Sequence, residues 1–203
     1  MCIETVEKLD FRRPIVPNAA ELGIAEADEL IGLIEGFARS ELCARLARAS
    51  DVRREERFAF PLSGVLIVGA LDVLAAEAAG RTLVVDYKSD RLDGMDPAAA
   101  VADSYTTQRL VYALAALRAG AQEVEVAHVF LEAVDRPVRA TFTAAQAPAL
   151  GSELHAAASG VLTRRFTVAQ VPHRGLCGGC PAEGGLCSWP LELTRRERDD
   201  QLF

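Results

Sequence analysis

Charged residues inside two apolar segments constrain the fold of this chain more than any other feature. The segment VLIVGALDVLAA (65–76) contains Asp72, and the segment RTLVVDYKS (81–89) contains Asp86 and Lys88. Runs of this length and composition, separated by a turn at Gly80, predict two neighbouring strands. An unpaired charge buried in such a strand is costly, so a compensating partner is expected. We therefore expect Asp72 and Asp86 side by side, with Lys88 on the same face as Asp86 and Tyr87 pointing away.

The rest of the chain alternates between helical and strand-like patterns. Apolar residues at helical spacing predict one or two helices over 19–49 and long Ala-rich helices over 96–119 and 144–163. Short β-branched or alternating runs predict further strands at 55–63, 124–133 and 137–143. This order is typical of an α/β fold with a mixed central sheet flanked by helices. We expect a core over 1–165 and a cysteine-rich tail over 166–203 packed on it.

Composition narrows the classes of protein that remain. With 203 residues, half of them hydrophobic, the chain can form one well-packed core. Charge interrupts every apolar stretch before the length of about 20 residues that a transmembrane helix needs, and the N-terminus does not resemble a signal peptide. We therefore expect a cytoplasmic protein without a membrane partner. The net charge of −7 excludes nucleic-acid binding through bulk positive charge, so any such contact must be local.

The predicted group of Asp72, Asp86 and Lys88 has the composition of a hydrolytic metal site. Two converging carboxylates repel each other, and Mg²⁺ or Mn²⁺ relieves that repulsion while presenting water for chemistry. A lysine beside them can orient or deprotonate the attacking water and stabilise charge on a phosphate. The alternative is a buried ion pair that only ties two strands together. Because the chain has twenty arginines and two lysines, a lysine within a strand favours a functional ammonium.

Three motifs in order resemble those of a known family. They are G-x-x-D at Gly69–Asp72, D-Y-K at Asp86–Lys88, and Y-x-x-Q-x-x-x-Y from Tyr105 through Gln108 to Tyr112. The pattern resembles the PD-(D/E)XK nuclease superfamily, in particular the RecB/AddA-like C-terminal nuclease domain of UvrD-type helicase-nucleases. The resemblance covers about residues 4–190 and implies a restriction-endonuclease-like core over 1–165.

The resemblance also implies roles for individual residues. Asp72, Asp86 and the backbone carbonyl of Tyr87 would bind Mg²⁺ or Mn²⁺, and Lys88 would act on the attacking water. Gln108 and Tyr112, one helical turn apart, would contact DNA or support the site. Relatives usually carry a further metal-binding histidine on an N-terminal helix. The chain has three histidines, His128, His155 and His173, and none is expected to replace it. The chain therefore either begins inside that helix or has an incomplete metal site.

The implied function is that of a Mg²⁺-dependent deoxyribonuclease, an exonuclease acting on single strands in DNA repair. It would work with a UvrD-type helicase on the same or a companion chain, since no phosphate-binding G-x-x-x-x-G-K-[ST] loop occurs here. The alternative is a catalytically incomplete DNA-binding or assembly module of such a complex.

Three cysteines near the C-terminus have metal-ligand spacing. Cys177, Cys180 and Cys187 lie within eleven residues of a Gly/Pro-rich segment. Some relatives combine such a triplet with an upstream cysteine to bind an iron–sulfur cluster, which implies a four-iron four-sulfur cluster here with Cys43 as the fourth ligand. Zinc is the alternative metal, and Cys2 or His173 are alternative fourth ligands. Three reduced cysteines without a metal remain the other interpretation.

Overall fold

The computed structural model describes residues 24–163, 165, 170–180 and 182–197. The chain forms two compact units, Met1–Ala157 and Ala158–Phe203, and each is treated by itself. Within the described ranges, no helix has the length and apolar character needed to cross a bilayer.

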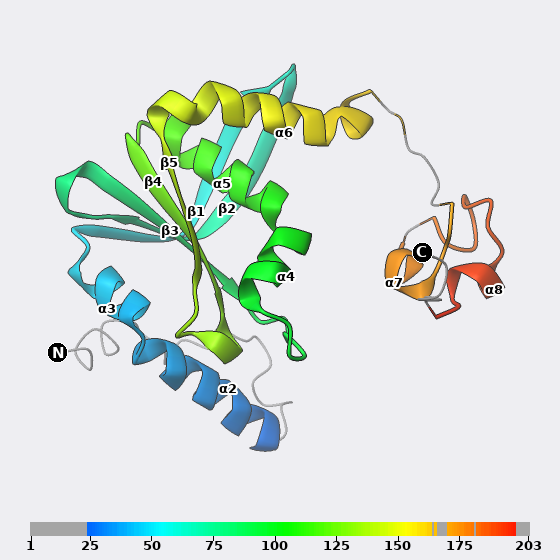
Figure 1. Ribbon diagram of the computed structural model, residues 1–203, viewed down its shortest axis with the longest axis horizontal. Helices are drawn as coiled ribbons and strands as arrows, with labels where there is room; N and C mark the ends of the chain where they lie inside the picture. The colour runs from blue at the N-terminus through cyan, green and yellow to red at the C-terminus, as the bar shows by residue number, and fades with distance from the viewer. Residues whose placement is uncertain (1–23, 164, 166–169, 181, 198–203) are drawn as a thin grey trace. The chain divides into compact units, whose positions relative to one another are not determined.

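A mixed five-stranded sheet forms the centre of the first unit (Figure 1). Its strands follow the sequence order, with antiparallel pairing throughout except between β3 and β4, which are parallel. The parallel pair requires a crossover, and helices α4 and α5 supply it. The strands are β1 (Asp51–Leu62), β2 (Val65–Ala76), β3 (Arg81–Lys88), β4 (Glu123–Phe130) and β5 (Val138–Thr143). This confirms the predicted α/β class with a mixed sheet flanked by helices.

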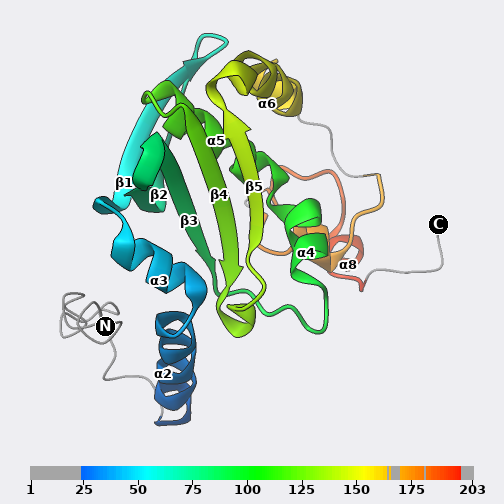
Figure 2. The ribbon, with the colours of Figure 1, turned by 60° about the vertical axis from the view of Figure 1, so that its left-hand side comes forward.

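Helices cover both faces of the sheet (Figure 2). On one face α2 and α3 pack on alternate residues of the central strands, such as Val85 and Val129. On the other face α5 and α6 pack on the intervening residues, such as Val84 and Val126. The helices are α2 (Ile24–Ala38), α3 (Glu41–Arg48), α4 (Pro97–Ser104), α5 (Thr106–Arg118) and α6 (Ala147–Leu162), with short 3-10 turns η2 (Ala78–Gly80), η3 (Leu131–Ala133) and η4 (Ala144–Gln146). The β3 and β4 strands are therefore buried on both faces, which explains their nearly continuous apolar sequence.

The helix predicted over 96–119 is in fact two helices that meet at Tyr105. The first begins as predicted, because the Asp96 side chain accepts hydrogen bonds from the amides of Ala98 and Ala99. At Tyr105 the backbone leaves the helical region, with φ −120° and ψ 6°. The next residue, Thr106, donates its hydroxyl hydrogen to the carbonyl of Ala102. Side-chain bonds of this kind compete with the helix and favour a bend.

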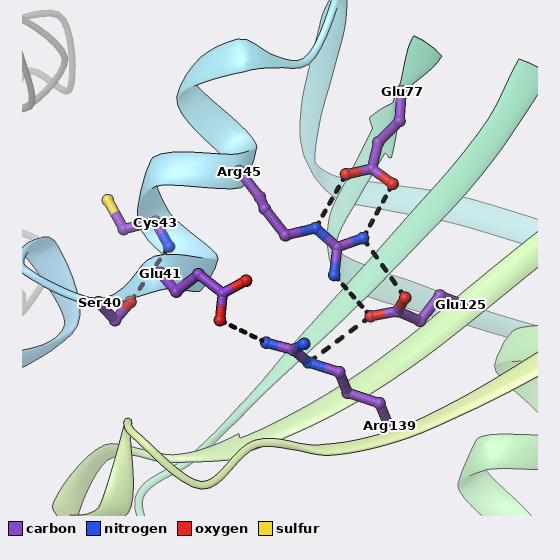
Figure 3. Close-up of polar contacts among 7 residues, drawn as sticks. All are labelled: Ser40, Glu41, Cys43, Arg45, Glu77, Glu125 and Arg139. Atoms are coloured by element: carbon purple, nitrogen blue, oxygen red, sulfur yellow. Dashed lines mark hydrogen bonds and ion pairs between the residues drawn. The ribbon is translucent and has the colours of Figure 1, made fainter. Parts of the chain in front are cut away.

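An ion-pair cluster attaches α3 to the sheet (Figure 3). The guanidinium of Arg45 donates to Glu77 at 2.9 and 3.0 Å and to Glu125 at 2.7 Å. Arg139 on β5 adds weaker contacts to Glu125 and to Glu41, at 3.7 and 3.6 Å. The Arg45 hydrogen bonds lower the pKa of Glu77 below its ordinary value. The cluster connects α3 with the residue that follows β2 and with strands β4 and β5, and so fixes α3 against the sheet.

After the end of α6, the described part of the second unit contains two short helices, α7 (Arg174–Cys177) and α8 (Leu191–Thr194). The amide of Arg174 donates to the carbonyl of Arg196, and the buried Thr194 hydroxyl donates to Glu183 at 2.9 Å. These bonds join α7 and the segment after it to α8 and the residues that follow α8.

Candidate active site

The β2 and β3 strands separate at the point where Asp72 and Asp86 lie opposite each other. Regular pairing joins Ala76 with Thr82 and continues as far as Val73 with Val85. One step further, the amide of Tyr87 donates to Asp72 Oδ2 at 2.9 Å. A side-chain oxygen therefore takes the place of a ladder bond, and it holds the Asp72 carboxylate at the fork between the strands.

The side chains of the β1–β2 hairpin stop alternating regularly between the two faces of the sheet next to Asp72, which explains why Asp72 lies at this fork. Leu71 packs in the core under α5, whereas Val73, two residues later, packs in the core under α3. In a regular strand these residues would share a face. On the paired strand, Glu55 has a positive φ of 49° between Arg54 and Glu56. The two strands of the hairpin thus change which set of side chains faces each helical layer at the level of Glu55 and Asp72.

Gly69 of the G-x-x-D motif is required by close packing. A Cβ atom at this position would lie 2.6 Å from Cζ of Phe58, which is closer than any stable contact. The Phe58 ring stacks near Phe60 and meets Tyr112 edge to face, with centroids 6.0 and 6.3 Å apart. The glycine therefore makes room for the ring of Phe58, which contacts Tyr112 at the site.

Three groups hold the ammonium of Lys88 (8% exposed). Its Nζ atom lies 2.7 Å from Asp86 Oδ2 and 2.8 Å from Gln108 Oε1. It also lies 3.9 Å from the ring centroid of Tyr105. A carboxylate, an amide and an aromatic ring together form a cage that fixes a compact charge. The bulkier guanidinium of arginine would not fit into this cage.

Gln108 connects the lysine to the last residue of the third motif. While its oxygen accepts from Lys88, its Nε2 donates to the hydroxyl of Tyr112 at 2.9 Å. Burial and the nearby carboxylates raise the pKa of Tyr112, so its phenol stays protonated. The five side chains predicted from the sequence thus form one group at the fork: Asp72, Asp86, Lys88, Gln108 and Tyr112.

The two carboxylates fit a divalent metal ion electrostatically. Burial raises the pKa of Asp72, and the charge of Asp86 raises it further, while the Tyr87 amide and Lys88 oppose the shift. Asp86 is 2% exposed. Within the described part of the chain, its Oδ2 atom accepts no hydrogen bond, although Lys88 is in ion-pair contact. A cation that binds both carboxylates would offset the cost of burying their charges and the repulsion between them.

Two further residues of the site were missed by the sequence analysis. Tyr105 was quoted only as part of a motif, yet its ring covers Lys88 and its hydroxyl donates to Asp90 at 2.7 Å. His128 was not expected to replace the missing histidine, yet it is fully buried on β4, in register with Asp86. Its ring lies 6.0 Å from that of Tyr105, between centroids. A histidine within the apolar segment VAHVF (126–130) was the one signal available.

The environment of His128 is unusual for a buried imidazole. Neither ring nitrogen has a hydrogen-bond partner among the residues that the structure describes. Burial, together with the charges of Lys88 and Arg109, lowers the pKa of His128 from 6.5 to about 4. The ring is therefore neutral near pH 7, with a donor and an acceptor both available beside the carboxylates.

The predicted cysteine ligands are divided between the two units. Cys43 is buried in α3, where its amide donates to the capping side chain of Ser40, whereas Cys177, Cys180 and Cys187 belong to the second unit. The described ranges contain no group of three His, Cys, Asp or Glu side chains arranged to hold a metal ion. Cys2 lies outside those ranges. An iron–sulfur or zinc centre therefore stays a prediction.

Comparison with known proteins defines the class to which this fold and site belong. The family model of the PD-(D/E)XK nuclease superfamily matches residues 4–185, and the chain is a member of that superfamily. A search of curated proteins finds no match.

Two solved structures are similar to the chain at low identity. The crystal structure of SSO0001 shares 16% identity with a TM-score of 0.36, over 69% of this chain and 63% of that one. A candidate exonuclease from Eubacterium rectale shares 13% identity with a TM-score of 0.43, over 82% of this chain and 65% of that one. The chain thus spans less than two thirds of the length of either protein.

Proposed function

We propose that this chain hydrolyses phosphodiester bonds of DNA at a divalent metal ion, Mg²⁺ or Mn²⁺, bound by Asp72, Asp86 and the backbone carbonyl of Tyr87. One observation carries the proposal. Lys88 is buried in ion-pair contact with Asp86 and is held by Gln108, at the fork where Asp72 faces Asp86. A bound metal ion would supply an activated water and neutralise charge on the phosphate.

The side chains then divide the remaining work. Lys88 orients the attacking water and stabilises the developing negative charge, which requires a compact ammonium close to the reacting phosphate. Gln108 fixes the position of the ammonium, and Tyr112 fixes the amide of Gln108.

We further infer that the substrate is single-stranded DNA, degraded as by an exonuclease during DNA repair, and that the chain works with a UvrD-type helicase on the same or a companion chain. The support is the order of the D-Y-K and Q-x-x-x-Y motifs, which resembles that of RecB/AddA-like nuclease domains.

The direct test is cleavage of end-labelled single-stranded DNA by the purified chain with Mg²⁺ or Mn²⁺. Lys88→Ala should abolish cleavage, and Arg39→Gln, which removes an exposed charge far from the fork in the sequence, should not. A circular single strand distinguishes the modes of attack, because an exonuclease leaves it intact. Absence of cleavage by the parent with either metal would overturn the proposal.

A second function is favoured by one observation. No third Asp, Glu, His or Cys side chain joins Asp72 and Asp86 in a metal-binding group within the described ranges. An incomplete metal site would suit a DNA-binding or assembly module. Such a module would bind the labelled strand without cutting it, and Lys88→Ala would leave its affinity within about twofold.

We also propose that Cys177, Cys180 and Cys187 bind a four-iron four-sulfur cluster with Cys43 as the fourth ligand, or a zinc ion. Their spacing is the support. Equal amounts of iron and sulfide in the purified protein would identify the cluster, and colourless protein that contains zinc would identify the alternative. Protein without either metal after anaerobic purification would contradict both.

A further inference from the structure

A pocket with several polar groups in its lining lies in the first unit, away from the group of residues around Lys88. It is open, has a volume of about 390 Å³, and lies where the β1–β2 turn meets the end of α5 and the start of α6. Figure 1 shows α6 passing beside the tip of this hairpin. The pocket is lined by Pro61, Leu62, Ser63, Arg118, Ala147, Pro148, Gly151, Ser152 and His155, and this lining contains no acidic residue.

Arg118 is held in a fixed orientation at this pocket. Its NH1 atom donates to the carbonyl of Pro61, and its guanidinium lies 4.8 Å from the ring centroid of Phe60. The NH2 atom is directed toward α6, 3.8 Å from where a Cβ atom of Gly151 would lie. Within the described residues Arg118 has no acidic partner, because every salt bridge found there involves other side chains. An ordered guanidinium without a carboxylate is suited to binding an anion.

Two hydroxyls and an imidazole complete the polar lining. Ser63 Oγ and His155 Nδ1 lie 2.6 Å apart, and the hydroxyl of Ser152 donates to the carbonyl of Pro148. The Ser63–His155 pair has the composition of a nucleophile and its base. However, the positive φ angles of Ser63 and Gly64, 50° and 84°, are those of a two-residue hairpin turn. The backbone at Ser63 is therefore explained by the turn, and the pair serves to fix the turn against α6.

We propose that this pocket binds a phosphate group through Arg118, His155 and Ser63. The group presents several strong acceptor oxygens, which match a guanidinium, an imidazole and a hydroxyl in one concave site. We assign the phosphate to the backbone of the nucleic-acid strand whose cleavage is proposed above, and this part rests on that function.

The fork and the pocket lie close to each other along α5, which supports a strand that contacts both. Beneath the surface, Tyr112, Phe58 and Phe60 make a continuous series of ring contacts in the core, and the guanidinium of Arg118 packs on the last ring. Arg118 follows Tyr112 by six residues on α5, a rise of about 9 Å along the helix axis. A strand bound at the fork can therefore reach the pocket within a few nucleotides. In a chain with a net charge of −7, a pocket without acidic residues offers the local contact that nucleic-acid binding requires.

The first experiment uses inorganic phosphate as the probe and does not depend on catalysis. Titration of ¹⁵N-labelled protein should shift the amide signals of Ser63, Gly151 and Ser152 to saturation. Arg118→Gln should weaken this binding by about tenfold, whereas the matched surface variant Arg39→Gln should not change it. His155→Gln, which keeps a hydrogen-bonding partner for Ser63, should also weaken it and guards against misfolding of the Arg118 variant. Absence of saturable shifts in the parent would overturn the site.

The second experiment identifies the source of the phosphate. Binding of a fluorescent single-stranded 12-mer and of a deoxymononucleotide is measured for the parent and Arg118→Gln at several salt concentrations, with Ca²⁺ in place of Mg²⁺. If the phosphate belongs to a strand, Arg118→Gln should bind the 12-mer about tenfold more weakly. The slope of log affinity against log salt concentration should also become smaller by about one. Equal loss for both ligands would assign the site to a free phosphate compound and overturn the assignment to a strand.

The two proposals fail separately. Lys88→Ala should keep the phosphate-induced shifts, because it lies outside the pocket. A parent that shows the shifts but never cuts DNA would contradict the proposed nuclease activity and leave the phosphate site intact.

Discussion

The ammonium of Lys88 illustrates how much of this site depends on single residues. A carboxylate and an amide are common partners for a lysine, but here the face of Tyr105 completes the cage at 3.9 Å. The Tyr105 hydroxyl is fixed in turn by Asp90, and burial together with that bond raises the pKa of Tyr105 to about 12. Tyr105 is thus a neutral ring held at a defined height above the lysine.

Replacing Tyr105 should separate the role of the ring from that of the hydroxyl. Because a cation–π contact is worth about 0.5–2 kcal/mol, Tyr105→Leu should lower kcat roughly 2- to 30-fold with little change in KM. Tyr105→Phe keeps the ring and should retain most of the activity. The measurement is steady-state cleavage of a labelled strand. An equal loss in both variants would mean that the Asp90 bond, and not the ring, matters.

His128 gives a prediction for stability rather than activity. Its folded pKa of about 4 lies below the ordinary 6.5, so the unfolded chain binds a proton first as the pH falls. Above pH 6.5 the imidazole is neutral in both the folded and the unfolded chain, so it does not lower the free energy of unfolding. Between pH 6.5 and 4 the free energy of unfolding should decrease, by about 3 kcal/mol in total, and below that it should level off.

Urea unfolding of metal-free protein across this range checks the prediction. His128→Leu removes the buried polar atoms that lack partners, and it should be at least as stable as the parent at pH 7. Its stability should also lose this part of the pH dependence. If the variant instead follows the parent curve, the imidazole is not the titrating group.

The residues that could be predicted are those whose charge conflicts with an apolar strand. Asp72, Asp86 and Lys88 are anomalous in their own segments, so pattern alone points to them. Tyr105 fits its local sequence and His128 gives only a weak signal, and their importance arises from a helix break and from register between parallel strands. Both depend on tertiary contacts that local pattern does not encode.

At the scale of elements, α3 owes its position to the Arg45 cluster as much as to its apolar face. Arg45, Glu77 and Glu125 are largely buried, with side chains 13–24% exposed. Removal of the guanidinium would leave two neighbouring carboxylates without their partner, which costs more than the loss of a surface pair.

Arg45→Met should therefore lower the free energy of unfolding by about 2 kcal/mol at pH 7, measured in urea. Arg39→Met, which breaks an exposed pair with Glu35 on α2, should cost less than about 0.5 kcal/mol. The pKa of Glu77 is lowered in the folded state, so its contribution is present above about pH 4.5 and is lost as the pH falls through the folded pKa. An equal cost of Arg45→Met at pH 7 and pH 3 would contradict this account.

Most elements could be predicted because their periodicity and their turn residues agree. The strand VLIVGALDVLAA has the predicted bounds of β2, and the crossover begins at the expected Asp96 cap. The division into α4 and α5 could not be predicted, since alanine and leucine favour a continuous helix on either side of Tyr105. Side-chain contacts of Tyr105 and Thr106 override that preference.

At the scale of the whole molecule, we expect the two compact units to unfold in separate events, because the buried hydrophobic core found in the described residues belongs to the first unit. The proposed metal ligands Asp72 and Asp86 both belong to the first unit, so Mn²⁺ at 100 times its Kd should stabilise that unit by about 2.7 kcal/mol. Calorimetry should show one transition that moves with Mn²⁺ and another that does not.

Asp72→Asn should abolish the shift caused by Mn²⁺. Without metal it should raise stability at pH 7, because burial and Asp86 disfavour the charged form of Asp72. The amide oxygen of asparagine can still accept the bond from the Tyr87 amide. Asp103→Asn, at an exposed position on α4, serves as the control. A Mn²⁺ shift that survives in Asp72→Asn would show that the ion binds elsewhere.

The order of strands leaves β1 at one edge of the sheet, and its long, exposed backbone is a potential template for another chain. The same strand carries Arg53, Arg54, Glu56 and Arg57 near its start and Pro61 near its end. Charged side chains and a residue that lacks an amide hydrogen both oppose the addition of a further strand. The hairpin that shapes the fork between β2 and β3 therefore also protects the protein against edge-to-edge aggregation.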